Sequence, residues 1–273
     1  MKKYKKILII MGISLTLINT GCSNENQTDE KENRVQSELD QKTQKKTALD
    51  KKVEKSFEEH LKIYPVKSLD DFYDMEGFRD EEFDKYDKGT WVLNSGFVKK
   101  KDKDSPLTTN DVFLFINRNS GKATGSYVIN EIYSDKKKNK KKEYKITIKD
   151  KKLRLIEDAP EDVKNEINRF EFLVESESFD ELRKYKKIKS RHNEELPLYT
   201  INYLLSEENN LNQWVQNQYK LKSKNAILYV EKSGAIEGSS LGDFEFKIEY
   251  PLESNGIQYF YESIIFQPSN EVT

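Results

Sequence analysis

Alternation of apolar and polar residues after Gly89 constrains the fold of this chain more than any other feature of its sequence. The segments TWVLNSGFV, from Thr90, and EYKITIKDKKLRLI, from Glu143, have the period of two that is typical of strands with one buried face. Turn residues such as Asn119-Ser120-Gly121 separate such segments at short intervals. The sequence therefore predicts antiparallel hairpins, and further strands are expected at LPLYTINYLL, NAILYVEKSG, DFEFKIEYPL and IQYFYESIIFQ.

Two principal amphipathic helices are predicted beside these strands. The first is expected over Thr47–Tyr64, where Thr47 and Asp50 have the spacing of a capping box. The second is expected over Pro160–Val174, and a polar helix is expected near Asn210–Tyr219. Helices beside hairpins, without regular βαβ alternation, indicate an α+β fold with a mainly antiparallel sheet. The residues that recur every four positions on one face of the first helix are Leu49, Val53, Phe57 and Leu61.

The order of these elements suggests an internal duplication into two similar α+β lobes, 49–157 and 158–273. Each half is expected to run from a helix through a short helix to a small antiparallel sheet. The pattern Ser-Gly-x-x-x-Gly-Ser begins at Ser120 and recurs from Ser233. Because unrelated α+β segments also share turn sequences, one compact domain stays open as the alternative.

The single cysteine of the chain, Cys22, closely follows an apolar run at the N-terminus. Four lysines precede the mainly apolar run Ile7–Ile18, which is shorter than the roughly 20 residues that a membrane-spanning helix needs. This pattern predicts a signal peptide over 1–21, cleaved after Gly21, with a diacylglyceryl group on the Cys22 thiol as in bacterial lipoproteins. Asn19 stands where such sites usually have a Leu-like residue, so an uncleaved anchor or secretion with a free thiol stays open.

Acylation of Cys22 would place the protein on the cell membrane, facing outward. Two or more acyl chains anchor a protein stably, whereas one holds it only marginally. Residues 22–48 contain almost nothing apolar after the cysteine and are therefore expected to form a flexible tether. No second cysteine exists for an intramolecular disulfide, so the core must be stable without one.

The sequence offers little sign of catalysis. The two histidines, His60 and His192, are far apart and lack the spacing of a zinc site. Neither Gly121-x-x-x-Gly125 nor its counterpart at Gly234 is followed by the Lys-Ser/Thr of a phosphate-binding loop. We therefore expect no enzyme activity, no cofactor, no metal and no nucleic-acid partner.

Two basic clusters are the candidate binding residues. The segments KKKNKKK and RKYKKIKSR could attract an anionic envelope polymer or lipid headgroups through counterion release. For the first, the alternative is a hairpin tip whose lysines block edge pairing. The second is expected to be partly helical. The candidate residues are Lys136, Lys137, Lys138, Lys140, Lys141, Lys142, Arg183, Lys184, Lys186 and Lys187.

Several segments in combination resemble the staphylococcal tandem lipoproteins, over essentially the whole chain from the first helix onward. They are YPVKSLDDFYDMEGFRDEEFDKYDKGTWV from Tyr64, FLFINRNSGKATG from Phe113, GSSLGDFEF from Gly238 and FQPS from Phe266, beside the leader and Cys22. The resemblance implies a membrane-anchored surface antigen, encoded among paralogues, whose lipid stimulates innate immune recognition. It also implies a role in entry into host cells, with a host heat-shock chaperone as partner. The family has no established catalytic residues to carry over.

Overall fold

The computed structural model describes residues 34–39, 41–77, 79, 83–179, 182–193, 198–222, 224–233, 244–252 and 256–269. The chain divides into two units, 1–31 and 32–273, and every described residue belongs to the second. The predicted signal peptide with Gly21, the lipidation site Cys22 and the first part of the tether lie outside the described residues.

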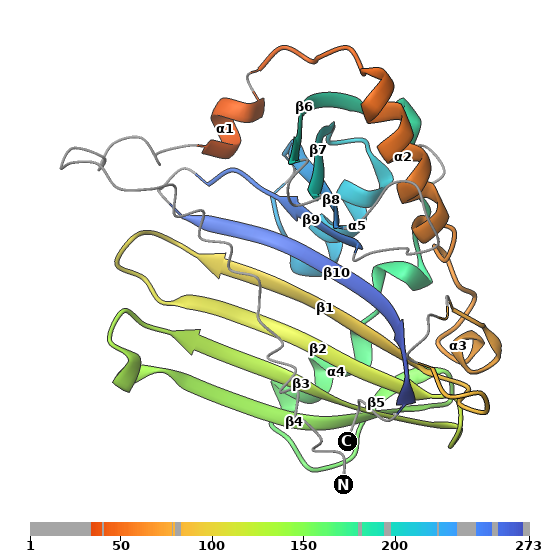
Figure 1. Cartoon of the computed structure of the whole chain (residues 1–273). Coiled ribbons are helices and arrows are strands. Elements are labelled where there is room, and N and C mark those ends of the chain that lie inside the picture. The colour runs from red at the N-terminus through yellow and green to blue at the C-terminus, as the bar shows by residue number, and fades with distance from the viewer. Residues whose placement is uncertain are drawn as a thin grey trace, which may run out of the picture. The chain divides into compact units, whose positions relative to one another are not determined.

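The strands form one antiparallel sheet in the order β5-β4-β3-β2-β1-β10-β9-β8-β7-β6 (Figure 1). Two meanders, β1 to β5 and β6 to β10, therefore join through β1 and β10, which pair from Thr90↔Gln267 to Lys100↔Ile257. The strand bounds are β1 Thr90–Lys100, β2 Leu107–Asn117, β3 Lys122–Ile132, β4 Lys140–Lys149, β5 Lys152–Leu155, β6 Lys186–Asn193, β7 Leu198–Leu205, β8 Ala226–Ser233, β9 Phe244–Glu249 and β10 Ile257–Gln267.

Helices and sheet contribute to one connected hydrophobic core. It contains Phe57 of α2, Leu93 of β1, Ile167 of α4 and Val215 of α5, each almost fully buried. The helix bounds are α1 Arg34–Leu39, α2 Ala48–Leu61, α3 Asp71–Asp74, α4 Glu161–Arg169 and α5 Asn210–Tyr219, and the 3₁₀ turns are η1 Lys136–Lys138, η2 Leu173–Glu175 and η3 Leu182–Lys184.

The predicted start of α2 is confirmed by its capping box. The Thr47 hydroxyl accepts from the Asp50 N–H at 3.1 Å, and the Asp50 carboxylate accepts from the Thr47 N–H at 2.6 Å. Val53, Phe57 and Leu61 are buried, as the spacing of four predicts. The helix ends at Leu61, a few residues before the expected end at Tyr64.

Two other predictions of secondary structure need correction. The second helix ends at Arg169 and not at Val174, which lies in η2. Its last part is replaced because the backbone N–H groups of Leu173 and Val174 bind the Glu262 carboxylate of β10. The basic segment after Arg183, expected to be partly helical, is a 3₁₀ turn followed by strand β6. The predicted polar helix is confirmed as α5.

The α+β class and the mainly antiparallel sheet are confirmed. Strands from both expected lobes, 49–157 and 158–273, lie in the same sheet and share the same core cluster. The internal duplication itself stays a prediction.

Candidate functional site

The first lysine cluster lies at the β3–β4 connection, as predicted for a hairpin tip. Lys136–Lys138 form η1, Lys140–Lys142 begin β4, and all six lysines are exposed. Two are paired with carboxylates, Lys140 with Glu131 at 2.9 Å and Lys141 with Glu143 at 2.7 Å. The cluster therefore offers exposed positive charge at the end of a hairpin. Because β5 pairs with β4 only over residues 146–149, lysines also suit the remaining edge of β4.

The second basic cluster does not form one surface. Arg183, Lys184 and Lys186 are exposed, and the Arg183 guanidinium binds the Glu58 carboxylate of α2 through two nitrogens. Lys187 is buried, and its ammonium donates to Asp50 at 2.6 Å and to the Ser190 hydroxyl at 3.3 Å. We therefore remove Lys187 from the polyanion-binding candidates, since its charge is already matched inside the protein.

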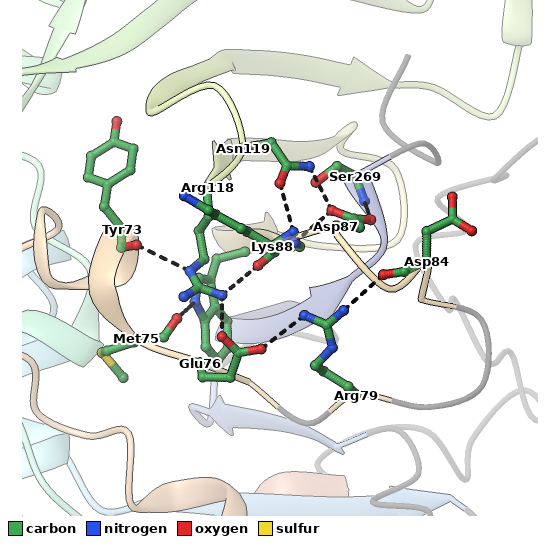
Figure 2. A network of polar contacts seen from close by, with 12 residues as sticks. Tyr73, Met75, Glu76, Arg79, Asp84, Asp87, Lys88, Arg118, Asn119 and Ser269 are labelled. Atoms are coloured by element: carbon green, nitrogen blue, oxygen red, sulfur yellow. Dashed lines mark hydrogen bonds and ion pairs between the residues drawn. The ribbon is translucent and has the colours of Figure 1, made fainter.

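Three of the segments that carry the family resemblance meet at Arg118, directly after β2 (Figure 2). The Arg118 Nε donates to the Tyr73 carbonyl at 3.2 Å, and its Nη1 donates to the Glu76 carboxylate at 2.7 Å. The same Nη1 donates to the Lys88 carbonyl, and the guanidinium lies over the Phe266 ring at 5.7 Å from its centroid. These contacts join the segments before β1, after β2 and at the end of β10.

Asp87 completes this Arg118 junction from the other side (Figure 2). Its carboxylate accepts from the Gly89 N–H at 2.8 Å, the Asn119 amide at 2.7 Å and the Ser269 N–H at 2.8 Å. Burial acts to raise the pKa of Asp87, but these donors outweigh it and lower the pKa below its ordinary value. The junction therefore holds the chain segments together.

Glu262 is a buried carboxylate inside the core. It accepts from the backbone N–H groups of Leu173 at 2.9 Å and Val174 at 3.0 Å. Burial raises its pKa to about 7, against the lowering effect of these two donors. Its partners are these two main-chain groups of η2 together with the Tyr64 side chain, so its position is explained by attachment of η2 and Tyr64 to β10.

The two histidines of the chain, which we expected not to bind a metal, lie on different elements, α2 and β6. The Nε2 of His60 lies 3.5 Å from the Lys232 ammonium, and His192 lies on β6. Among the described residues, no group of three or more His, Cys, Asp and Glu side chains could hold a metal ion. Every helix in the described ranges is too short or too polar to cross a bilayer.

A polar cleft of ≈ 370 Å³ lies beside α5. Its lining residues are Glu171, Glu177, Asn210, Gln213, Trp214, Asn217 and Gln218. The sequence predicts the polar helix here but not a site beside it. The sequence pattern that could have identified this wall of the cleft is the spacing i, i+3, i+4, i+7 and i+8, which places four amides and a tryptophan on one helix face. The two glutamates of the cleft come from a separate segment, so this pattern does not include them.

Comparison with known proteins places the chain in a family. The Csa1 family profile matches residues 49–269. The chain is 34% identical over 226 residues to the uncharacterized lipoprotein SA0096 of Staphylococcus aureus strain N315, covering 80% of this chain and 88% of the relative. It is 34% identical over 282 residues to the uncharacterized lipoprotein SERP2465 of Staphylococcus epidermidis, covering 99% of this chain and 100% of the relative.

Among solved structures, LprF from Mycobacterium bovis aligns with a TM-score of 0.36 and 6% sequence identity, covering 66% of this chain and 86% of that chain. At this TM-score the similarity assigns neither a fold nor a role to this chain. The family match and the two relatives instead confirm the resemblance to staphylococcal lipoproteins. This protein therefore belongs to the Csa1 family.

Proposed function

We propose that the protein is a lipoprotein anchored through Cys22 to the outer face of the cell membrane, where its folded part binds a partner without catalysing a reaction. The alignment with the Staphylococcus epidermidis lipoprotein carries this proposal, because it covers 99% of this chain and so includes the N-terminal region around Cys22. Attachment by two or more acyl chains would be stable without a transmembrane helix.

Two perturbed carboxylates, Glu262 and Glu175, have positions that structure explains without catalysis. Glu262 and Glu175 both have a pKa raised to about 7 by burial, and both accept backbone N–H groups. Each therefore has a structural reason for its position. The segment Gly238–Gly242, GSSLG, has the spelling of a hydrolase nucleophile elbow and lies outside the described residues. A motif of this spelling makes a nucleophile elbow only where the serine stands between a strand and a helix, so the spelling alone does not indicate catalysis.

The family resemblance extends the proposal to the host. The lipid would make the protein visible to innate immune receptors, and the folded part would act as an antigen and promote entry into host cells through a host chaperone. A Cys22→Ala strain separates these roles. Loss of the immune response with unchanged entry would assign them to different parts, and unchanged responses in both assays would contradict the proposed need for the anchor.

The intact mass of the protein extracted from membranes tests the anchor directly. The expected wild-type chain begins at Cys22 and is heavier by its acyl chains, whereas the Cys22→Ala chain carries no acyl chain. A wild-type chain with a free thiol, or one cleaved at another residue, would overturn the proposal.

A second candidate function is binding of an anionic envelope polymer, and the exposed lysines at η1 favour it. Replacement of Lys136, Lys137 and Lys138 by Gln should weaken binding to isolated wall polymer and reduce its salt dependence. The matched control replaces Lys51, Lys52 and Lys55, on the exposed face of α2, by Gln and changes the net charge equally. Equal losses in both variants would indicate a general charge effect and contradict a specific site.

A further inference from the structure

Helix α5 has an uncharged surface in a chain rich in charge. Asp, Glu, Lys and Arg make up 35% of the sequence, yet Asn209–Tyr219 contains none of them. Lys and Glu favour helices more than Asn does, so a helix that is merely solvated gains nothing from this composition. The exposed amides of α5 therefore need an explanation other than helix stability.

The amides on the buried face of α5 are explained by their hydrogen bonds. The Asn212 amide donates to the Ser206 carbonyl at 2.8 Å and to the Lys224 carbonyl at 2.9 Å, and the Gln216 amide donates to Asn212 at 2.8 Å. These buried amides bind main-chain carbonyls of the segments before and after the helix, at Ser206 and Lys224. The amides of the outer face make no hydrogen bond with any other described side chain or backbone group, and they are Asn210, Gln213, Asn217 and Gln218.

The outer face of α5 forms one wall of the polar cleft, and Glu171 and Glu177 contribute the other. Burial raises the pKa of Glu177, as expected for a carboxylate partly withdrawn from water. Trp214 lies among the amides, and its ring is fixed by an edge contact with Phe260 at 5.5 Å between centroids. The cleft thus combines a fixed aromatic ring with amides that have no partner among the described residues, whereas Glu171 accepts from the Ser176 hydroxyl at 3.4 Å.

The chemistry of these groups identifies a ligand class. Amides donate and accept hydrogen bonds and carboxylates accept them, which matches hydroxyl groups that do both. An indole ring offers an apolar surface to the C–H face of a sugar ring. Among the described lining residues none is basic, so the cleft does not suit a polyanion. Its volume of ≈ 370 Å³ falls within the usual range for small-ligand sites, about 300–1,000 Å³.

We propose that the cleft between α5 and the segment Glu171–Glu177 binds an uncharged carbohydrate through the outer amides of α5 and the ring of Trp214. The inference rests on the proposed function as a binding protein and names its ligand class. Such a ligand has two sources at a bacterial surface, the glycan strands of the cell wall and the glycans of host cells. Both present hydroxyl groups and sugar rings to the same side chains.

The test uses the full lipidated chain, purified in a detergent without sugar headgroups. Chitotetraose represents wall-type glycans, and N-acetyllactosamine and mannose oligosaccharides represent host glycans. Binding is followed by tryptophan fluorescence, for which Trp214 is the suitable reporter, since Trp91 is buried and donates to the Met75 carbonyl. Titration calorimetry gives the affinity independently.

Wild-type protein should bind at least one oligosaccharide with little change when NaCl is raised from about 0.1 to about 0.5 M. The Gln213→Ala/Asn217→Ala variant, which alters exposed side chains, should bind about tenfold or more weakly. The control Asn165→Ala/Asn168→Ala alters exposed amides of α4 that do not line the cleft and should bind as wild type.

Binding of chitotetraose alone would assign the ligand to the wall, and binding of lactosamine or mannose oligosaccharides alone would assign it to the host. Absence of binding to all of them, or equal binding by the cleft variant, would overturn the carbohydrate site. The mass measurement at Cys22 is independent of these titrations. An acylated chain that binds no sugar contradicts this inference alone, whereas an unacylated chain that binds sugar contradicts only the anchor.

Discussion

Lys187 of β6 and Asp50 of α2 form an ion pair at 2.6 Å, with only 3% and 5% of their side chains exposed. Burial acts to raise the pKa of Asp50, but hydrogen bonds from Lys187, Thr47 and Ser190 lower it to about 2. The same carboxylate caps α2 through the Thr47 N–H. This pair therefore links the start of α2 to the edge strand of the sheet.

Replacement of Lys187 by Met should lower the free energy of unfolding by about 3–5 kcal/mol at pH 7, because Asp50 is left as an uncompensated buried charge. Urea denaturation measures the loss. The control Lys186→Met changes the exposed neighbour on the same strand and should cost less than about 1 kcal/mol. Similar losses in both variants would show that the pair does not stabilise the fold.

The stability that Asp50 contributes should depend on acid pH. Its folded pKa of about 2 lies below its ordinary value of 3.8, so the contribution is fully present above the ordinary value and is lost as pH falls through about 2. The wild-type unfolding free energy should fall over this window more steeply than that of an Asp50→Asn variant. Parallel curves for the two proteins would contradict the assignment.

Glu262 should make the protein less stable as pH rises toward neutral. Its folded pKa of about 7 lies above its ordinary value of 4.5, so folding favours its protonated form and stability declines across this window. The decline from Glu262 is on the order of 2–3 kcal/mol between about pH 4.5 and 7. Urea denaturation at several pH values should show a smaller decline for Glu262→Gln.

Two further variants separate this effect from that of other carboxylates. Glu175 also has a pKa raised to about 7 by burial, so Glu175→Gln should remove a further part of the decline. Glu143 is exposed and its pKa is lowered by the Lys141 ammonium, so Glu143→Gln should leave the decline near neutral pH unchanged. A full decline in the Glu262→Gln protein would contradict the role of that carboxylate.

The sequence predicted those elements that are determined by residues close together in the chain. The start of α2 followed from Thr47 and Asp50, which lie three positions apart and bind each other. The early end of α4 could not be predicted in this way. Glu262 binds the N–H groups of Leu173 and Val174 from 88–89 positions away, and this distant partner makes η2 possible where a continuous helix pattern was expected.

The same limit applies to the candidate sites. Lys187 resembled its exposed neighbours in the sequence, and only its pairing with Asp50, 137 positions away, explains why it is buried. The amides of α5 were visible as a polar helix, but Glu171 and Glu177 become part of the cleft through the tertiary fold. Sequence patterns thus identified Lys187 and the amides of α5 as polar groups. Their partners across the pair and across the cleft come from distant segments and could be identified only from the tertiary fold.

Arg118 should be more sensitive to a conservative change than its neighbour Arg79. Its planar guanidinium binds the Tyr73 and Lys88 carbonyls and Glu76, and only 10% of its side chain is exposed. Because Lys cannot reproduce this geometry, Arg118→Lys should cost about 2–3 kcal/mol in the free energy of unfolding. Arg79→Lys, at a more exposed side chain, should cost less than about 1 kcal/mol. Equal costs would argue against the junction.

Gly89 and Gly121 both have a positive φ, +78° and +62°, but they differ in the space around them. A Cβ at Gly89 would lie 2.3 Å from the Phe266 ring, whereas a Cβ at Gly121 would meet nothing within 4 Å. Gly121→Ala should therefore cost only the backbone strain, about 1–2 kcal/mol. Gly89→Ala should cost about 1–3 kcal/mol more, because Phe266 must move. In a Phe266→Ala background the cost of Gly89→Ala, measured by urea denaturation, should fall to that of Gly121→Ala. An unchanged cost in that background would place the strain at Gly89 in the backbone alone.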